Sequence, residues 1–418
     1  MPIHRSTACL IFDIDIESEP SWKEGPLPLN LASSSIQSLS VEQADIDARM
    51  GYFQPRVRTA LYGRPDKPSR WYEARRETVN GHAIFGVEII QSPSILRGHS
   101  GVGVVHLELT GAPVNALHEL RDLSASPQGK QTRKQLGQVL APGTTMGASQ
   151  NRATTVAHVT FADGPDRVLP PAYDDWDPSQ QWLWLLASAT PPDSFLPDLH
   201  EKALFDGTVY FSQDWRALVL RDGVAFLGLT PDPEDTRTFH HAAETYVHTI
   251  YLDVVVLGQL QKYALNQFAD DIASTDLKSV TPDRLARFEE RLFGIRNELW
   301  LRHVTIRGKG NELLERYQDQ NHLSQLHESI VSDLADFARF VDAVTNRRIT
   351  TAVGLITVLG LPLGLAYAGG QVWGRASPVT LAICTAIATT VAIIFITLIP
   401  AVRGMLHSLF RHDDDIPD

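Results

Sequence analysis

The chain contains little cysteine and no excess of basic charge. Its 418 residues include two cysteines, Cys9 and Cys384, so neither a disulfide framework nor a cysteine zinc site is expected, and the compartment reads as reducing. The formal net charge is -12, whereas a protein that binds the nucleic-acid backbone needs a clustered basic surface. Nucleic acid is therefore excluded as a partner.

The sequence also lacks the common enzyme signatures. It has no Gly-rich phosphate loop that ends in Lys-Ser or Lys-Thr, and no His-Glu-x-x-His zinc helix. The run Gly98-His-Ser-Gly-Val-Gly103 does not have the spacing of a nucleophile elbow. We nominate no catalytic residue and expect no enzyme.

Charge is absent from two long runs near the C-terminus. The stretches 349–374 and 376–402 contain no charged residue, and a helix over 349–370 would be about 33 Å long, enough to cross a bilayer. We predict a first span over 349–370, an outer loop over 371–378, a second span over 379–402 and a tail over 403–418. The lipid bilayer is then a partner.

The basic residues beside these runs predict the orientation. Arg347, Arg348, Arg403 and Arg411 flank the outer ends of the hairpin, and the loop has Arg375 alone. We therefore expect an integral protein of the inner or plasma membrane with both termini in the cytoplasm.

A helical stalk is predicted before the first span, over 231–348. Its helices cover about 235–272, 281–304 and 310–348, and the last continues into the span. Apolar residues with coiled-coil spacing form a seam at Leu323, Ile330, Leu334, Phe337 and Val341. This seam favours a homo-oligomer.

Residues 1–230 are predicted to form a cytoplasmic α/β domain. A helix over 111–123 follows a strand, and the segments 17–40 and 124–152 are expected to be loops. The predicted strands, from alternation and β-branched content, are 8–16, 83–91, 103–109, 154–161, 182–187, 208–212, 215–221 and 224–229. The expected fold class is thus an α+β/α-helical membrane protein: a mixed α/β domain, antiparallel long helices and a two-helix transmembrane hairpin.

This layout resembles the CorA-type metal ion transporters. The local sequence from Leu355 to Gly370, with its Leu361-Pro362 pair, is similar to the first span of that family. The resemblance implies a pentameric cation channel, a divalent cation such as magnesium, and a regulatory cation site at Asp333, Asp336 and Asp342. The family's Gly-Met-Asn signature is replaced by Gly369-Gly-Gln-Val-Trp-Gly374. Magnesium selectivity is therefore not carried over.

A stripe of small and polar residues on the first span could line a pore. Pro362 would kink this helix and Gly360 would allow close packing. The candidate pore-lining residues are Asn346, Thr350, Thr357, Leu361, Gly364 and Gln371. The alternative is that this stripe packs against neighbouring helices.

Two further alternatives stay open from the sequence. His240, Glu244 and His248 lie at helical spacing and either bind a transition metal or form a solvated polar stripe. The chain as a whole is either a channel or transporter, or a membrane-tethered sensor or effector whose hairpin anchors it or forms a signal-gated pore.

Overall fold

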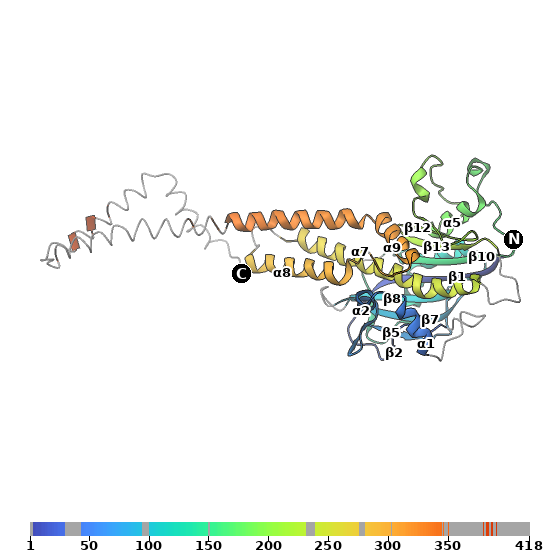
Figure 1. Cartoon of the computed structure of the whole chain (residues 1–418), viewed down its shortest axis with the longest axis horizontal. Coiled ribbons are helices and arrows are strands. Elements are labelled where there is room, and N and C mark those ends of the chain that lie inside the picture. Colours follow the sequence, from blue (N-terminus) through green and yellow to red (C-terminus); the bar gives the residue numbers. More distant parts are fainter. Residues whose placement is uncertain are drawn as a thin grey trace. The chain divides into compact units, whose positions relative to one another are not determined.

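The computed structural model describes residues 3–29, 43–93, 100–148, 151–230, 239–275, 281–301 and 303–344, with single positions up to 390. The chain divides into two compact units. The first comprises Met1–Thr275 and Ala286–Asp333, and the second comprises Asp276–Leu285 and Leu334–Asp418. The sheet and the helices that pack on it belong to the first unit (Figure 1).

The first unit is built on an 11-stranded mixed sheet. Its pairs are antiparallel except for β10 and β13, which run parallel. The main order is β11 (Thr208–Tyr210), β12 (Trp215–Leu220), β13 (Gly223–Gly228), β10 (Thr154–Phe161), β1 (Ile3–Ile16), β8 (Ser100–Glu108), β7 (His82–Gln91), β5 (Arg70–Glu73) and β2 (Lys23–Glu24), with β6 (Thr78–Val79) on β7 and β9 (Thr144–Met146) on β1. A separate hairpin joins β3 (Gly63–Arg64) and β4 (Lys67–Pro68).

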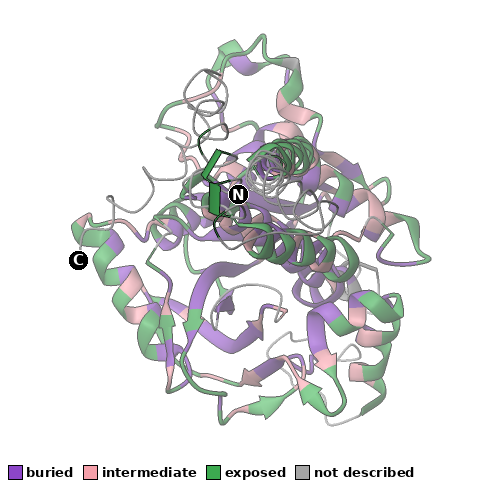
Figure 2. Cartoon of the chain, turned by 90° about the vertical axis from the view of Figure 1, so that its left-hand side faces the viewer, coloured by how far each residue is buried: buried purple, intermediate pink, exposed green. Residues whose placement is uncertain are grey.

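One face of the sheet is apolar. Successive side chains of a strand point to opposite faces, and Ala8, Leu10 and Phe12 of β1 point to the same one. They share a core with helices α3 (Pro113–Arg121), α4 (Pro127–Val139) and α5 (Pro178–Ser188). The strands are buried along most of their length, as Figure 2 shows in purple. Burial of this surface is the main source of the unit's stability.

The opposite face of the sheet carries polar groups. Here α1 (Gln43–Gly51), α2 (Pro55–Tyr62), α6 (Phe239–Tyr246), α7 (Leu252–Ala273) and α9 (Gly308–Gln320) supply the helical layer. A π-helical turn, η3 (Val247–Tyr251), separates α6 from α7. Helices α7 and α9 are close because Gly258 lies under the ring of Tyr317, whose hydroxyl donates to Gln259 at 2.7 Å.

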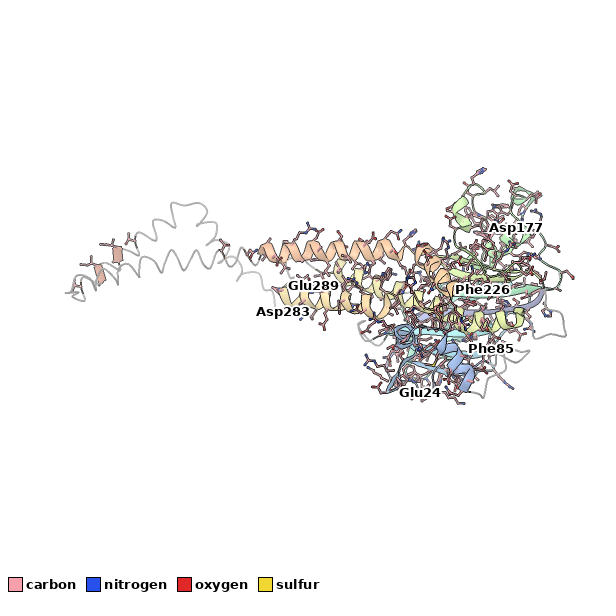
Figure 3. The ribbon with its side chains drawn as sticks, viewed as in Figure 1. Glu24, Phe85, Asp177, Phe226, Asp283 and Glu289 are labelled. Carbon is pink, nitrogen blue, oxygen red and sulfur yellow. The ribbon has the colours of Figure 1, made fainter. Side chains whose placement is uncertain are left out.

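The strand predictions for residues 1–230 are confirmed except at 182–187. That stretch lies in α5, which begins with a capping box at Asp177, the residue labelled in Figure 3. The Asp177 side chain accepts from the backbone N–H of Gln180, and the Gln180 side chain accepts from the backbone N–H of Asp177. Pro178 occupies the first turn, where a proline is favourable. The segment predicted to be a loop over 124–152 contains α4 and β9. Local capping and the helix propensity of Leu thus outweigh the β propensity of Trp.

The third predicted stalk helix, over 310–348, is interrupted in the structure. Helix α9 ends at Gln320, and His322 adopts a left-handed φ of 53°, so the chain cannot continue as one helix from residue 310. A new helix covers 323–344. The other stalk helices are α6, η3 and α7 in place of 235–272, and α8 (Pro282–Gly294) with the π-helical turn η5 (Ile295–Leu299) in place of 281–304. The short 3-10 turns η1 (Pro171–Tyr173) and η2 (Lys202–Phe205) complete the elements.

The membrane assignment made from the sequence is corrected by the structure. Among the described residues, no helix is both long enough and apolar enough to span a bilayer. The longest named helix, α7, has 22 residues but includes Asp253, Lys262, Asp270 and Asp271. This finding contradicts the expected membrane fold class, the channel and the integral-membrane localisation. The absence of charge in a run of residues describes only its composition, whereas a transmembrane span also requires that the run form one continuous apolar helix. Most of 349–402 lies outside the described residues.

Candidate metal centre

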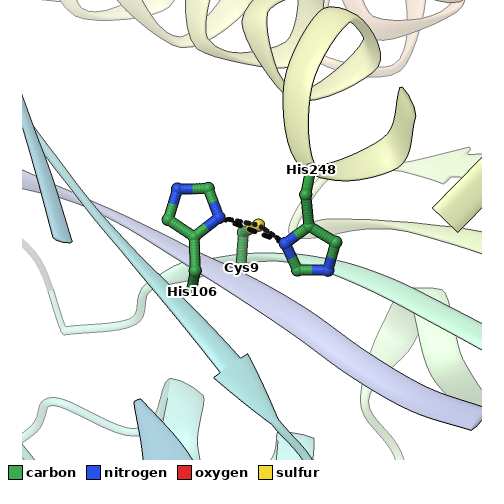
Figure 4. A group of neighbouring side chains, drawn as sticks. All are labelled: Cys9, His106 and His248. Carbon is green, nitrogen blue, oxygen red and sulfur yellow. Dashed lines mark hydrogen bonds between the residues drawn. The ribbon is translucent and has the colours of Figure 1, made fainter. Parts of the chain in front are cut away.

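Three side chains that can bind a metal meet on the polar face of the sheet. Cys9 in β1 and His106 in β8 are directly opposed in the antiparallel ladder, so their side chains share one face. His248 comes from the π-helical turn η3, above that face (Figure 4). A π turn inserts one extra residue into a helix and is frequent at functional sites.

The three donor atoms form a compact triangle. Sγ of Cys9 lies 3.1 Å from Nδ1 of His248 and 3.5 Å from Nδ1 of His106. The two Nδ1 atoms are 3.1 Å apart. All three residues are fully buried. The group therefore has the ligand types and the proximity of a metal site.

The outer nitrogen of each imidazole is held by a hydrogen bond. Nε2 of His106 donates to Oε1 of Glu88 at 3.0 Å, and Nε2 of His248 donates to the hydroxyl of Thr7 at 2.9 Å. The Thr7 hydroxyl in turn hydrogen-bonds the carboxylate of Glu244, which forms an ion pair of 2.6 Å with Arg5. In this arrangement both Nδ1 lone pairs point to the centre of the triangle, as in sites where outer hydrogen bonds orient histidine ligands.

Glu88 belongs to a fully buried ionic network of two arginines and two carboxylates. Arg70 donates to Glu88 at 2.5 Å and Arg49 approaches it at 3.4 Å. The two arginines also each lie 2.7 Å from Asp253 of α7. Tyr62 of α2 donates to Asp253 at 2.6 Å. The formal charges of this network cancel, so Glu88 stays anionic and can accept the imidazole N–H.

The surroundings of the triangle shift the pKa values of Glu88, both histidines and Cys9. Burial alone would raise the pKa of Glu88, but Arg70, Arg49 and the His106 hydrogen bond hold it well below its usual range. Burial lowers the pKa of His106 and, more strongly, that of His248, so both rings are neutral at physiological pH. Burial, with Glu88 as a second cause, raises the pKa of the Cys9 thiol. Without an ion, the triangle is therefore a thiol facing two imidazole lone pairs.

The geometry fits a transition-metal ion. With metal–nitrogen distances of about 2.0–2.1 Å, a metal–sulfur distance of about 2.3 Å and tetrahedral angles, the donors would be about 3.3–3.6 Å apart. The observed edges of 3.1, 3.1 and 3.5 Å approach these values. Phe85 of β7, labelled in Figure 3, packs against both imidazoles with centroid distances of 5.6 and 5.4 Å. The aromatic ring keeps the centre dry and fixes both rings.

The residues predicted from the sequence are placed differently. Within the set His240, Glu244 and His248, Glu244 forms an ion pair with Arg5 and His248 is part of the triangle. The side chain of His240 lies outside the described residues. Asp333, Asp336 and Asp342 are exposed on the helix 323–344, and Asp336 pairs with Arg339 at 2.6 Å. A regulatory cation site at these three aspartates stays a prediction.

Four of the six pore-lining candidates lie outside the described residues. Asn346 and Thr350 are helical and exposed. The others, together with the expected kink and packing positions, fall outside the described part of the chain: Thr357, Gly360, Leu361, Pro362, Gly364 and Gln371. The sequence argument against a cysteine zinc site considered the two cysteines alone, whereas the structure brings Cys9 together with two histidines that are distant in sequence, in a group that could hold a metal ion.

The comparisons with known proteins give no relative for this chain. No protein-family model, no curated protein and no solved structure matches it. The chemistry of the site therefore follows from its own atoms.

Proposed function

We propose that this chain is a metal-responsive binding protein in which Cys9, His106 and His248 bind one Zn²⁺ ion. The observation that carries the proposal is the orientation of the two imidazoles. Glu88 and Thr7 take their outer N–H groups and leave both Nδ1 lone pairs 3.1 Å apart beside a thiol. With both outer nitrogens protonated, the two Nδ1 lone pairs face each other, and a cation bound by both would remove their repulsion.

The donor set favours zinc over magnesium. One thiolate and two imidazoles are soft to intermediate ligands, whereas magnesium prefers oxygen ligands and retains water. On binding, Zn²⁺ replaces the thiol proton of Cys9, a Zn–S bond forms, and the proton is released to solvent. The two neutral imidazoles bind without loss of a proton. The resemblance to the CorA-type transporters implies a divalent cation such as magnesium. The ion proposed here is also divalent, but it is zinc and it is bound by other residues.

The burial of the centre favours a structural or sensory role over catalysis. A catalytic zinc site keeps one coordination position open to substrate. Here Cys9, His106 and His248 are each 0% exposed, so substrate has no direct access to the ion. The ion instead connects two strands with the π-helical turn. Its binding would lock the segment α6–η3–α7 onto the sheet and so report the available metal as a change in local stability.

The decisive test is a metal titration of the purified full chain. After removal of bound ions with a chelator, Co²⁺ should bind with a stoichiometry of one and show thiolate-to-cobalt charge transfer, and Zn²⁺ should displace it. The variants Cys9→Ser, His106→Gln and His248→Gln should each lose this signal. His82→Gln is the matched control, because His82 is also a buried histidine, in β7, accepts a hydrogen bond from the backbone N–H of Thr110, and is not part of the triangle.

Two results would overturn the proposal. One is a wild-type chain that binds neither Co²⁺ nor Zn²⁺ after reduction of its thiols. The other is a Cys9→Ser variant that binds Co²⁺ as tightly as the wild type. Circular dichroism on every variant separates a loss of binding from a loss of folding.

A further inference from the structure

A cavity of about 420 Å³ shares Arg49 with the ionic network that contains Glu88. It is lined by the segment before residue 30, by α1, by the π-helical turn and by Arg307. Its volume falls within the range of about 300–1,000 Å³ that is typical of small-molecule sites. All of its lining residues belong to the first compact unit.

The wall of the cavity has apolar and polar parts. Leu27 and Leu29 are buried, and Ile46 of α1 and Ile250 of the π-helical turn complete an aliphatic surface. Tyr246 adds an aromatic side chain. Such a surface fits the hydrocarbon or aromatic body of a small ligand.

Of the two arginines that line the cavity in the described part of the chain, only Arg307 has a guanidinium that is free to bind a ligand. Arg49 is fully used, since its guanidinium donates to Asp253, Glu88 and the carbonyl oxygen of Leu27. Arg307 is exposed, and its guanidinium lies 5.6 Å from the ring centroid of Tyr52. Within the described residues, no carboxylate forms an ion pair with Arg307. A guanidinium in this state matches a carboxylate.

We propose that this cavity binds a small carboxylate with an apolar body, with Arg307 as the carboxylate ligand and the side chains of Ile46 and Ile250 beside the body. Asp45 also lines the cavity, and its charge would oppose a second anionic group. The preferred ligand is therefore a monoanion.

The same cavity is linked to the metal centre. Thr249 and Ile250 line it and directly follow His248 in the π-helical turn, and Arg49 contacts both the cavity and Glu88. A carboxylate that packs on Ile250 favours the turn conformation that presents His248. By linkage, the ligand raises the affinity for zinc, and zinc raises the affinity for the ligand by the same factor. This second step rests on the proposed function, whereas binding of the carboxylate does not.

Calorimetric titration with 3-phenylpropionate tests the cavity. The uncharged isostere 3-phenylpropionamide should bind at least about tenfold more weakly, because a charge-assisted hydrogen bond is lost. Arg307→Gln should weaken 3-phenylpropionate by a similar factor and leave the amide unchanged. Arg296→Gln is the control, since Arg296 is an exposed arginine that does not line the cavity. Ile46→Trp, which fills the cavity from α1, should abolish binding of both probes.

Equal affinity for the acid and the amide, or an unchanged affinity in Arg307→Gln, would refute the carboxylate site. The same titration in Cys9→Ser separates the two proposals. If the metal centre is wrong and the cavity is right, 3-phenylpropionate still binds, and added Zn²⁺ leaves its affinity unchanged in the wild type and in Cys9→Ser alike. If both are right, Zn²⁺ raises the affinity in the wild type alone.

Discussion

The Nδ1 atoms of His106 and His248 lie 3.1 Å apart although 142 positions separate the residues in the chain. One belongs to a rigid central strand and the other to a π-helical turn. An ion between them would therefore join a stable element to one whose backbone hydrogen bonds are irregular.

Metal binding should slow amide hydrogen exchange in the π-helical turn. We expect the amides of 245–252 to gain protection when Zn²⁺ is added, because opening of the turn would then require breaking a metal–nitrogen bond. The amides of α4, on the opposite face of the sheet, should not change. His248→Gln should remove the gain, and equal protection of 245–252 with and without Zn²⁺ would contradict the link.

Glu88 is expected to be a positioning residue for the centre. Glu88→Gln leaves Arg49 and Arg70 with one carboxylate between them, so we expect a loss of about 3–5 kcal/mol in the free energy of unfolding. Since the amide polarises His106 less, metal affinity should also fall by about 10- to 100-fold. The loss of metal affinity distinguishes a residue that positions His106 from one that only stabilises the fold.

The control for this variant is Glu77→Gln. Glu77 is 47% exposed and pairs with Arg75 at 3.3 Å, so its substitution should cost no more than about 1 kcal/mol. Urea unfolding gives the stabilities and competition between Co²⁺ and a chelator gives the affinities. A Glu88→Gln variant as stable as Glu77→Gln would show that the network contributes little.

The sequence predicts the sheet better than the site. Alternation along β1 and the apolar runs of β7, β8 and β10 identify these strands because each buries a whole row of side chains. The order of the strands and the parallel pair of β10 and β13 depend on contacts distant in sequence, which no local pattern contains.

The group of Cys9, His106 and His248 is not predicted from the sequence for a related reason: its members are distant in the chain. Cys9 and His106 each stand alone as polar interruptions of an apolar strand, and such an interruption can equally be a hydrogen-bonded core residue. The helical spacing of His240, Glu244 and His248 predicts one shared face, but the π-helical turn at Val247–Tyr251 changes which side chains share a face. Beyond Cys9 itself, the sequence contains one weak signal: Thr7, Cys9 and Asp13 share the face of β1 that also carries Ile11, while the other face is apolar.

Asp13 should make the unfolding free energy depend on pH. It lies in β1 and is 8% exposed, and burial raises the pKa of its carboxyl to about 6. Between the unfolded value of about 3.9 and this folded value, the folded state holds the proton more tightly, so this contribution to stability falls as pH rises through that window. Asp13→Asn should therefore gain stability relative to wild type on going from about pH 4 to about pH 7.5.

The size of this gain is limited by the shift. A difference of about two pKa units corresponds to at most about 3 kcal/mol, and relaxation of the site would reduce it. Urea unfolding at both pH values measures the change, with Asp15→Asn as the control, since Asp15 is an exposed carboxylate of the same strand. A difference between Asp13→Asn and wild type that does not vary with pH would mean that Asp13 stays ionised in the folded state.

The contact of α7 with α9 provides a test of the helical layer. A Cβ atom at Gly258 would lie 2.4 Å from Cδ1 of Tyr317, which is fully buried. Because Tyr317 is held by its hydrogen bond to Gln259, it cannot rotate away without losing a buried partner. Gly258→Ala should therefore lower the free energy of unfolding by about 1–3 kcal/mol, despite the better helix propensity of alanine. Gly137→Ala is the matched variant, since Gly137 lies in α4 and a Cβ added there would have no atom within 4 Å, so we expect a gain of about 0.5–1 kcal/mol. Opposite signs in urea unfolding would establish the close approach of α7 and α9, and a gain at both positions would contradict it.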